Sequence, residues 1–380
     1  MPVEMITGNQ AAALAAQRAG VDLVAAYPIT PQTAIVEYLA EFWARGELGG
    51  EFVSVESEYA ALACSSGAAA LGARTFSATS SHGLAYMHEM LHWCAGARYP
   101  MVLVNVNRAL GAPWCLEPDQ GDSLSQRDTG WLQLYCANAQ EIFDTILQAF
   151  ALAETIMIPC MVVFDGFYLS HTYEAVEVPD QETVRRFLQP PSFDPPLVPG
   201  RHANLHALTT GEVQTGLIRE RHRVMQGAAA VLAEIDTRFQ AVFQRGYGAL
   251  AAEIPAGAKT VVLAAGSCAE TVRWHLPHLA GTGLINLRMF RPFPGDILCR
   301  MLEEKAVERV VVVDRNCSPG VGGILAQELK AALYRMAQPP VVHDLLLAGG
   351  IDFTPRMLTE ALAEKRASAR SAEIWGVELS

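Results

Sequence analysis

The segment Met101-Val102-Leu103-Val104-Asn105-Val106 is the clearest strand in the sequence. It is almost continuously apolar, which is typical of a strand that is buried on both faces of a parallel sheet. On either side of it, strand-like runs alternate with helical patterns through the first 185 residues. This alternation predicts an α/β domain in which helices cover both faces of a parallel sheet. In such a sheet, ligands bind at the carboxyl ends of the strands.

The N-terminal half is expected to contain five strands and five helices. The strands are predicted at 22–26, 51–55, 74–78, 101–106 and 160–164. The helices are predicted at 9–18, 31–43, 58–70, 84–97 and 139–154.

Composition changes after residue 189, because five of the 21 prolines lie between Pro190 and Pro199. Proline at this density favours an extended linker. A helix is predicted at 212–243, and a second alternating unit has strands predicted at 260–264, 284–287, 309–313 and 341–346. We therefore predict two doubly wound, mostly parallel α/β domains at 1–188 and 256–380, joined by a Pro-rich linker and helical connection at 189–255.

Composition also narrows the class of protein. Apolar residues make up 51% of the 380 residues, and the formal net charge is −12, which argues against a nucleic-acid partner. No apolar run approaches the roughly 20 residues that span a bilayer, so no membrane association is expected. The eight cysteines form no CxxC pair, which argues against an iron–sulfur cluster or structural zinc held by this chain. Scattered thiols without a signal-like N-terminus fit the cytoplasm.

The run from His88 to His92 matches the HExxH pattern of zinc hydrolases. Two histidines four residues apart share one helix face, and the intervening glutamate could activate a metal-bound water. The alternative is a helix with two ordinary histidines. A zinc hydrolase using His88 and His92 therefore stays open as an alternative function.

Two strand ends in the first domain carry further candidates. Tyr27-Pro28-Ile29-Thr30-Pro31 follows the first predicted strand, and its prolines stiffen the turn around Thr30. Thr30 either presents its hydroxyl to a ligand or caps a helix that begins with Pro31. Glu58 opens the helix after the next strand. Its carboxylate either answers the helix dipole or takes part in proton transfer.

Arg108 follows the 101–106 strand at its carboxyl end. A guanidinium suits bidentate binding of a carboxylate, but pairing with Glu117, Asp119 or Asp122 is the alternative. The loop at 111–128 is long for a compact domain, which favours a function.

Taken together, several runs resemble one family, the alpha chain of the pyruvate ferredoxin oxidoreductases. The N-terminal runs are YPITP (27–31), VESEYAAL (55–62), GARTFSATSSHGL (72–84), NRAL (107–110), QRDTGW (126–131) and DGFYLSHTYE (165–174). The C-terminal runs are LINLRMFRPFP (284–294) and VVVDRNCSPGVGG (311–323). They occur in the family's order over nearly the whole chain.

The resemblance implies the alpha subunit of a thiamine-diphosphate-dependent, CoA-acylating 2-oxoacid oxidoreductase. Such an enzyme converts a 2-oxo acid to acyl-CoA and CO₂. The expected domains are a pyrimidine-binding-like domain and a transketolase C-terminal-like domain. The chain contains no GDG motif, and in this family a beta subunit holds the diphosphate and Mg²⁺. The expected partners are that beta subunit, a gamma subunit, a ferredoxin-like delta subunit with [4Fe-4S] clusters on partner subunits, and ferredoxin or another electron acceptor.

The resemblance also implies residue roles. Glu58 would face N1′ of the aminopyrimidine, with Tyr27, Pro28 and Ile29 binding the cofactor. The substrate-binding residues would be Thr30, Arg108, Trp114 and Gln120, with Thr30 and Arg108 on the carboxylate.

One departure bears on the substrate, because Gln120 stands near the place where pyruvate-type members often carry histidine. Pyruvate, 2-oxoisovalerate and an aryl glyoxylate such as phenylglyoxylate therefore all stay open. The direction of flux is open too. A non-catalytic scaffold subunit is the other alternative.

Overall fold

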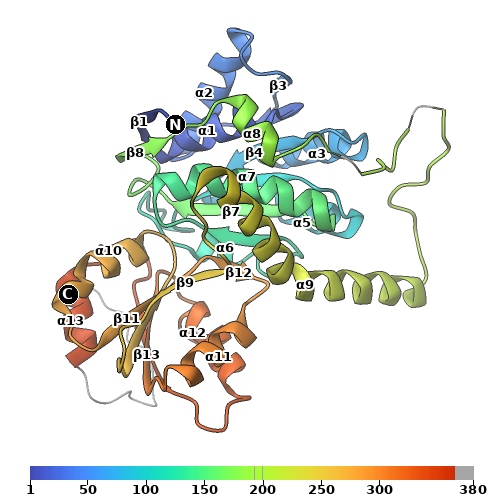
Figure 1. Cartoon of the computed structure of the whole chain (residues 1–380). Coiled ribbons are helices and arrows are strands. Elements are labelled where there is room, and N and C mark those ends of the chain that lie inside the picture. The colour runs from blue at the N-terminus through green and yellow to red at the C-terminus, as the bar shows by residue number, and fades with distance from the viewer. Residues whose placement is uncertain (192, 199, 364–380) are drawn as a thin grey trace.

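The computed structural model describes residues 1–191, 193–198 and 200–363, and its strands form three sheets (Figure 1). The seven strands of the largest sheet are β2 (Leu23–Ala26), β3 (Glu51–Ser54), β4 (Thr75–Thr79), β5 (Val102–Asn107), β6 (Leu132–Tyr135), β7 (Cys160–Asp165) and β12 (Met289–Arg291). The five strands of the second are β9 (Leu250–Glu253), β10 (Thr260–Ala264), β11 (Thr282–Leu287), β13 (Arg309–Asp314) and β14 (Val341–Leu346). The third is the antiparallel pair β1 (Val3–Thr7) and β8 (Tyr173–Glu177).

Helices surround both larger sheets. In the N-terminal half they are α1 (Gly8–Ala19), α2 (Thr33–Ala44), α3 (Glu58–Ala70), α4 (Ser81–Tyr86), α5 (His88–Ala97), α6 (Gly121–Leu124), α7 (Ala139–Ile156) and α8 (Gln181–Phe187). The remaining ones are α9 (Gly211–Phe243), α10 (Ser267–His275), the 3₁₀ turn η1 (Leu276–His278), α11 (Gly295–Glu304), α12 (Ile324–Leu333) and α13 (Pro355–Ala363).

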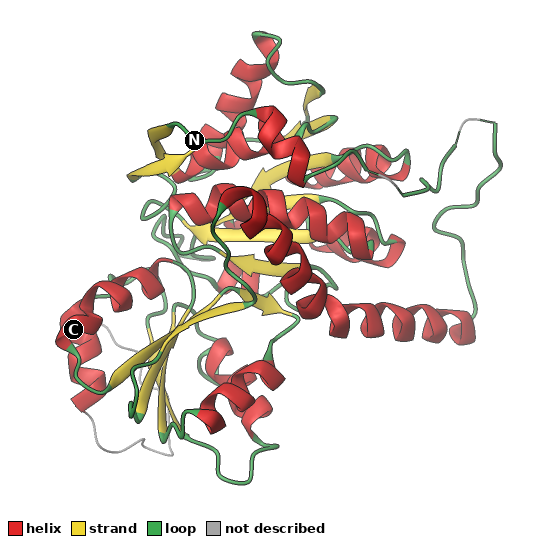
Figure 2. Ribbon diagram, in the orientation of Figure 1, coloured by secondary structure: helices red, strands yellow, loops and turns green. Residues whose placement is uncertain are grey.

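Strand β5 shows why the large sheet is buried on both faces. Val102, Val104 and Val106 pack in a core cluster with residues of α1, α7 and α9, whereas Leu103 packs in another with residues of α3, α4 and α5. Side chains alternate along a strand, so a run that is apolar at nearly every position needs helices on both sides. Figure 2 shows helices on both faces of this sheet. The predicted α/β class with two mostly parallel sheets is confirmed.

Each of the two larger sheets has an edge strand from outside its own predicted domain: β12 in the seven-stranded sheet and β9 in the five-stranded sheet. The strand order of the first is β12-β6-β7-β5-β4-β2-β3, and that of the second is β14-β13-β10-β11-β9. The outer strands β12 and β9 each pair antiparallel to their neighbours, and the other pairings in these two sheets are parallel. Strand β9 comes before residue 256, and β12 lies inside 256–380 although it extends the N-terminal sheet. The three-part division 1–188, 189–255 and 256–380 stays a prediction.

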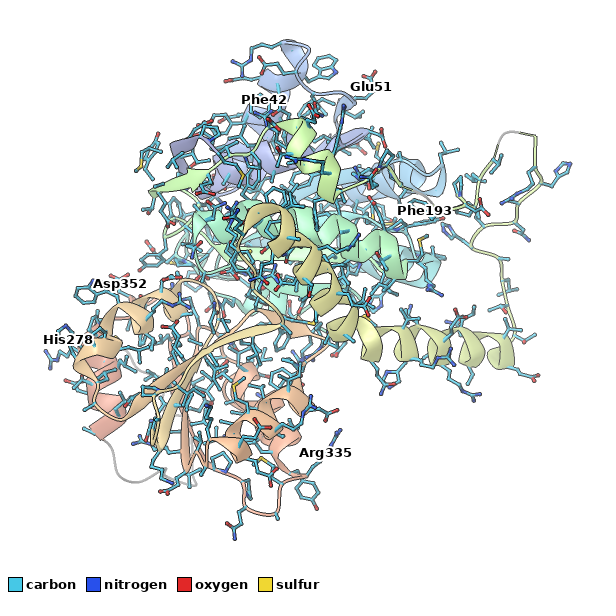
Figure 3. The ribbon with its side chains drawn as sticks, in the orientation of Figure 1. Phe42, Glu51, Phe193, His278, Arg335 and Asp352 are labelled. Carbon is cyan, nitrogen blue, oxygen red and sulfur yellow. The ribbon has the colours of Figure 1, made fainter. Side chains whose placement is uncertain are left out.

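The N-terminal part of α9 projects away from the packed helices and sheets. Residues 211–220 are all exposed, and burial along α9 begins only in its second half, with Ala228 and Leu232 (Figure 1). Side chains fill the space between helices and sheets, whereas the loop that carries Phe193 lies outside the packed layers (Figure 3). No helix in the described part of the chain is long and apolar enough to cross a membrane.

Two predicted helices differ from the structure. The helix expected at 84–97 begins earlier and is divided at Met87, which keeps right-handed dihedrals (φ −76°, ψ −6°). The helix expected from Pro31 begins at Thr33 with Gln32 as its N-cap, so Thr30 is not the capping residue. The Gln32 side chain donates to the carbonyl of Tyr27 in the preceding turn and to the carbonyl of Ala78 on β4, so a tertiary contact helps to set where the helix begins.

Candidate functional site

Four strand ends of the large sheet create one polar edge. Strands β2, β3, β4 and β5 are parallel, so the segments that follow them lie at the same edge. These segments carry Thr30 after β2, Glu58 after β3, His82 after β4 and Arg108 after β5. The structure therefore brings the three predicted catalytic residues, Thr30, Glu58 and Arg108, to one edge of the sheet, and it adds His82.

The side-chain amides of Asn9 and Gln32 hold the turn at 27–31 in place. Asn9 Nδ2 donates to the Pro31 carbonyl at 2.8 Å, and Gln32 Nε2 donates to the Tyr27 carbonyl at 2.9 Å. The Thr30–Pro31 peptide bond is cis. The Thr30 side chain is exposed, while its backbone carbonyl accepts a hydrogen bond from Arg108 Nη1 at 2.7 Å. The turn thus presents both a hydroxyl without a partner among the described residues and a carbonyl that orients the arginine.

Arg108 is a buried cation with donors to spare, and only 6% of it is exposed. Besides Thr30, it meets His82, with 3.3 Å between Nη2 and Nδ1. Its Nε is buried without a hydrogen-bond partner in the described structure. Burial lowers the pKa of Arg108, while the negative charges of Asp122 and Glu58 raise it. A guanidinium has five N–H donors and only two meet acceptors here, so the group can still bind an anion bidentately.

The alternative that Arg108 pairs with a loop acid is wrong for its guanidinium. Within residues 1–191, 193–198 and 200–363, that group forms no ion pair with Glu117, Asp119 or Asp122. Asp122 instead accepts from the backbone amide of Arg108 at 3.2 Å.

Asp122 organises the edge from inside the protein. Its carboxylate accepts from the backbone amides of Ser81 (2.9 Å) and Arg108, and from the side-chain amides of Asn105 (3.1 Å) and Asn107 (2.5 Å). Burial raises the pKa of Asp122 to about 6, against the opposing effect of these hydrogen bonds. The same contacts hold Ser81 at φ +48°. One buried carboxylate thereby joins the end of β5 to the start of α4.

Glu58 lies at the first turn of α3, whose N-cap Ser57 accepts from Ala60 N at 3.2 Å. Only 9% of Glu58 is exposed, yet no group in the described part of the chain hydrogen-bonds to its carboxylate. A Cβ built on Gly83 would lie 2.7 Å from Glu58 Oε1 and 2.6 Å from Thr79 Oγ1. The missing side chain at Gly83 therefore leaves space for a half-enclosed, unpaired acceptor.

The two residues expected at the substrate side chain lie in different surroundings. Trp114 is 65% exposed, and its ring centroid is 5.7 Å from the Arg108 guanidinium carbon. Gln120 is buried, and its Nε2 lies 3.3 Å from Asp165 Oδ1 and 3.4 Å from the Ala265 carbonyl, at the contact with the C-terminal sheet. The structure thus groups Trp114 with Arg108 and gives Gln120 other partners.

The HExxH residues lie on α5, the helix that follows α4. The rings of His88 and His92 are 4.9 Å apart between centroids, and His88 Nδ1 lies 2.5 Å from Gln126 Oε1. No group of three or more His, Cys, Asp or Glu in the described residues has the arrangement of a metal site. The zinc hydrolase alternative therefore gains no support from the geometry.

A family model for the thiamine-diphosphate-binding part of pyruvate flavodoxin/ferredoxin oxidoreductases matches residues 14–237. The model of core domain II of pyruvate:ferredoxin oxidoreductase matches residues 258–358. The chain belongs to the pyruvate:ferredoxin oxidoreductase family. It is an alpha subunit of a 2-oxoacid:ferredoxin oxidoreductase, as the sequence runs predicted, and the zinc hydrolase alternative is wrong.

Curated relatives match over most of their length. The ketoisovalerate oxidoreductase subunit VorA of Pyrococcus horikoshii is 43% identical over 377 residues, covering 95% of this chain and 93% of the relative. The pyruvate synthase subunit PorA of Methanocaldococcus jannaschii is 41% identical, covering 87% of each. The fold also matches a solved 2-oxoglutarate:ferredoxin oxidoreductase of Magnetococcus marinus, with a TM-score of 0.76 and 21% identity over 95% of this chain and 64% of that one.

The residues around Glu58 fit a thiamine pyrimidine. The carboxylate has no hydrogen-bond donor among the described residues, the missing side chain of Gly83 leaves the space that it occupies, and Thr79 Oγ1 and Ser80 Oγ at the end of β4 are buried without hydrogen-bond partners in the same part of the chain. An aminopyrimidine is planar and carries ring nitrogens and an amino group, which complement such unsatisfied polar atoms.

Sequence reasoning missed three contributors to this edge: His82, Gly83 and Asp122 as a structural acceptor. His82 and Gly83 follow the predicted strand at 74–78 after a short turn. Because ligands bind at the carboxyl ends of parallel strands, both residues could have been predicted in the same way as Thr30 and Arg108. The hydrogen bonds of Asp122 are set by tertiary structure and leave no local signal.

Proposed function

We propose that this chain supplies the substrate-carboxylate site and the pyrimidine side of the active site in a 2-oxoacid oxidoreductase complex. The observation that carries the proposal is the buried Arg108, with unused donors, beside the unpaired carboxylate of Glu58 at the carboxyl edge of the sheet. The overall reaction turns a 2-oxo acid and CoA into acyl-CoA and CO₂, and it releases one proton and two electrons to acceptors such as ferredoxin.

Arg108 and the Thr30 hydroxyl bind the carboxylate of the 2-oxo acid in this proposal. The Thr30 carbonyl orients the guanidinium from one side, which leaves the second N–H of Nη1 and of Nη2 for the anion, while Nε is buried. Burial strengthens such a charged contact, because little water competes for the donors. The same fork holds the carboxylate in place until CO₂ leaves.

In this proposal the Glu58 carboxylate shares a proton with N1′ of the pyrimidine. When bound, thiamine diphosphate would supply the nucleophilic carbon and the electron sink that decarboxylation of a 2-oxo acid needs. Glu58 holds a proton with N1′, and its lack of other partners leaves its oxygens free for that bond. Tyr27, Pro28 and Ile29 are proposed to contact the cofactor from the adjoining turn.

The partners are proposed from the chemistry that this chain does not supply. A beta subunit holds the diphosphate and Mg²⁺, and gamma and ferredoxin-like delta subunits complete the complex with [4Fe-4S] clusters. The curated relatives are themselves named as subunits, which supports an assembly of several chains.

The substrate is proposed to be a small or branched 2-oxo acid. The names of the relatives, ketoisovalerate oxidoreductase and pyruvate synthase, favour 2-oxoisovalerate or pyruvate. Trp114, at the open side of Arg108, is the proposed contact of the substrate side chain. Gln120 stays a predicted specificity residue, although its hydrogen bonds to Asp165 and Ala265 favour a structural role.

The test is to purify the complex through this chain, identify the partner chains and assay CoA- and cofactor-dependent reduction of ferredoxin with pyruvate, 2-oxoisovalerate, 2-oxoglutarate and phenylglyoxylate. We expect turnover with at least one of the first two. A purified complex without 2-oxo acid turnover, although its Fe–S clusters and cofactor are loaded, would favour the scaffold alternative.

A further inference from the structure

His82 lies beside the proposed carboxylate site, and the function described above gives it no role. It is exposed at the second residue of α4, directly after Ser81. Its Nδ1 is 3.3 Å from Arg108 Nη2, and its Nε2 is 3.0 Å from the Gly111 carbonyl and 3.2 Å from the Gly111 amide nitrogen. The imidazole thus stands between the arginine and the loop that follows it.

The chemistry of the arginine fixes how the ring is used. A guanidinium can only donate, so Nδ1 of His82 must accept from Arg108. The hydroxyl of Ser81, 3.4 Å from Nδ1, donates its hydrogen to the Ala109 carbonyl at 2.8 Å and does not compete. In the neutral ring the hydrogen then lies on Nε2, which donates to the Gly111 carbonyl at 3.0 Å and cannot at the same time accept from the Gly111 N–H at 3.2 Å.

Gly111 belongs to a tight turn that also carries Trp114. A Cβ on Gly111 would lie 2.2 Å from the Pro113 carbonyl oxygen and 2.7 Å from Trp114 Cα, so the backbone of the turn folds back against Gly111. Trp114 in turn covers the Arg108 guanidinium at 5.7 Å. A hydrogen bond to Gly111 therefore also places the indole.

We propose that His82 is a positioning residue with two separate tasks: its Nδ1 orients Arg108 for the substrate carboxylate, and its Nε2 fixes the Trp114 turn that meets the substrate side chain. This inference rests on the proposed function of Arg108. It assigns specificity to a contact between α4 and the 109–117 loop, in addition to the pocket residues themselves.

Three variants separate the two tasks. His82→Ala removes both hydrogen bonds. His82→Asn retains an acceptor near the position of Nδ1 but does not reach Gly111. His82→Gln retains a donor near the position of Nε2 but offers Arg108 no acceptor there. Because the side chain is exposed, all three are expected to fold, and thermal unfolding of the purified complex checks this.

The kinetic test uses KM and kcat for pyruvate and 2-oxoisovalerate. Loss of one charged hydrogen bond is expected to raise KM on the order of 10-fold, with a smaller change in kcat because substrate binding is affected first. We expect His82→Gln to raise KM for both acids equally. We expect His82→Asn to retain KM for the preferred acid and to change the ratio of kcat/KM between the two. His82→Ala should do both.

A readout without turnover follows the turn itself. The fluorescence anisotropy of Trp114, taken as the difference between each variant and its Trp114→Phe partner, should fall in His82→Ala and His82→Asn and stay at the wild-type level in His82→Gln. Equal anisotropy in all three, or three variants with one kinetic behaviour, would overturn the two-task assignment.

Arg108→Ala, assayed in parallel, distinguishes a failure of the His82 inference from a failure of the proposed carboxylate site. If Arg108→Ala impairs turnover and the His82 variants do not, the inference on His82 fails and the proposed function stands. If Arg108→Ala leaves turnover intact, the proposed carboxylate site itself is wrong.

Discussion

A Cβ added to Gly83 would lie 2.7 Å from Glu58 Oε1. The absence of a side chain at Gly83 therefore creates the space that the Glu58 carboxylate occupies. Gly83 has no left-handed backbone conformation to maintain, and the close approach alone explains glycine at this position. The relationship links the helix after β4 to the proposed proton-transfer group after β3.

Gly83→Ala is therefore expected to move the Glu58 side chain and lower kcat of the complex by about 10-fold or more, because the added Cβ would lie within 3.0 Å of Glu58 Oε1, Glu58 Cγ and Thr79 Oγ1. The matched control is Gly67→Ala in α3, where an added Cβ meets nothing within 4 Å. That variant should retain kcat and gain roughly 0.5–1 kcal/mol of stability from helix propensity. Equal activity in both variants would show that the position of Glu58 is not critical.

Glu58→Gln should leave the melting temperature nearly unchanged, because the carboxylate forms no hydrogen bond within the described structure. An amide cannot share a proton with N1′, so hydrogen–deuterium exchange at C2 of the bound cofactor should slow by roughly 10²- to 10⁴-fold. NMR of the quenched cofactor measures this rate. Glu56→Gln, at an exposed position two residues away, should exchange at the wild-type rate. An unchanged rate in Glu58→Gln would exclude Glu58 from proton transfer.

Sequence predicted the parts of this site whose signals are local. The continuous apolar run at 101–106 needs helices on both faces, and the proline-stiffened turn around Thr30 and the arginine after β5 both follow strands. Parallel pairing of consecutive strands then brings such ends together.

The sequence contains no comparable signal for the pairing of segments that are far apart in the chain. Strand β12 joins β6 across more than 150 residues of sequence, and each is at most four residues long. Asp122 looked like any acid in a loop, and only the fold brings five donors, from Ser81 to Ser123, around it. His82 was missed because its partners, Arg108 and Gly111, lie 26 and 29 residues away.

Arg108→Ala is expected to lower kcat/KM for every accepted 2-oxo acid by roughly 30- to 1000-fold, equivalent to about 2–4 kcal/mol for a charged hydrogen-bond partner in a desolvated site. Arg108→Lys should recover little, because an ammonium cannot reproduce the planar fork. Steady-state kinetics with the substrate panel gives both numbers.

Trp114→Ala is the contrasting variant, since the indole is mostly exposed and lies over the guanidinium. It should change the ranking of substrates and cost the preferred one less than about 10-fold, in line with an exposed cation–π contact of about 0.5–1 kcal/mol. If Arg108→Ala altered only the ranking and Trp114→Ala abolished turnover, the two halves of the pocket would be assigned the wrong way round.

Asp122→Asn should destabilise the chain by about 2–4 kcal/mol, because one carboxylate oxygen becomes an amide donor that faces N–H groups and leaves them unsatisfied. Denaturant unfolding of the complex measures the difference. The control is Asp128→Asn in the same region, since the Asp128 side chain is 84% exposed and its ion pair with Arg127 is long, at 3.9 Å. Equal stability of both variants would show that the buried network contributes little.

The stability gap between wild type and Asp122→Asn should depend on pH. The pKa of Asp122 rises from 3.8 to about 6 on folding. Between these values the native state holds a proton that the unfolded state has lost, so the contribution of Asp122 to stability falls as pH rises through this window. Asparagine does not titrate, and the other acids cancel in the difference. The gap should therefore be largest near pH 4 and decrease up to about pH 6. A gap that widens with rising pH would mean that the five donors outweigh burial and lower the pKa of Asp122 instead.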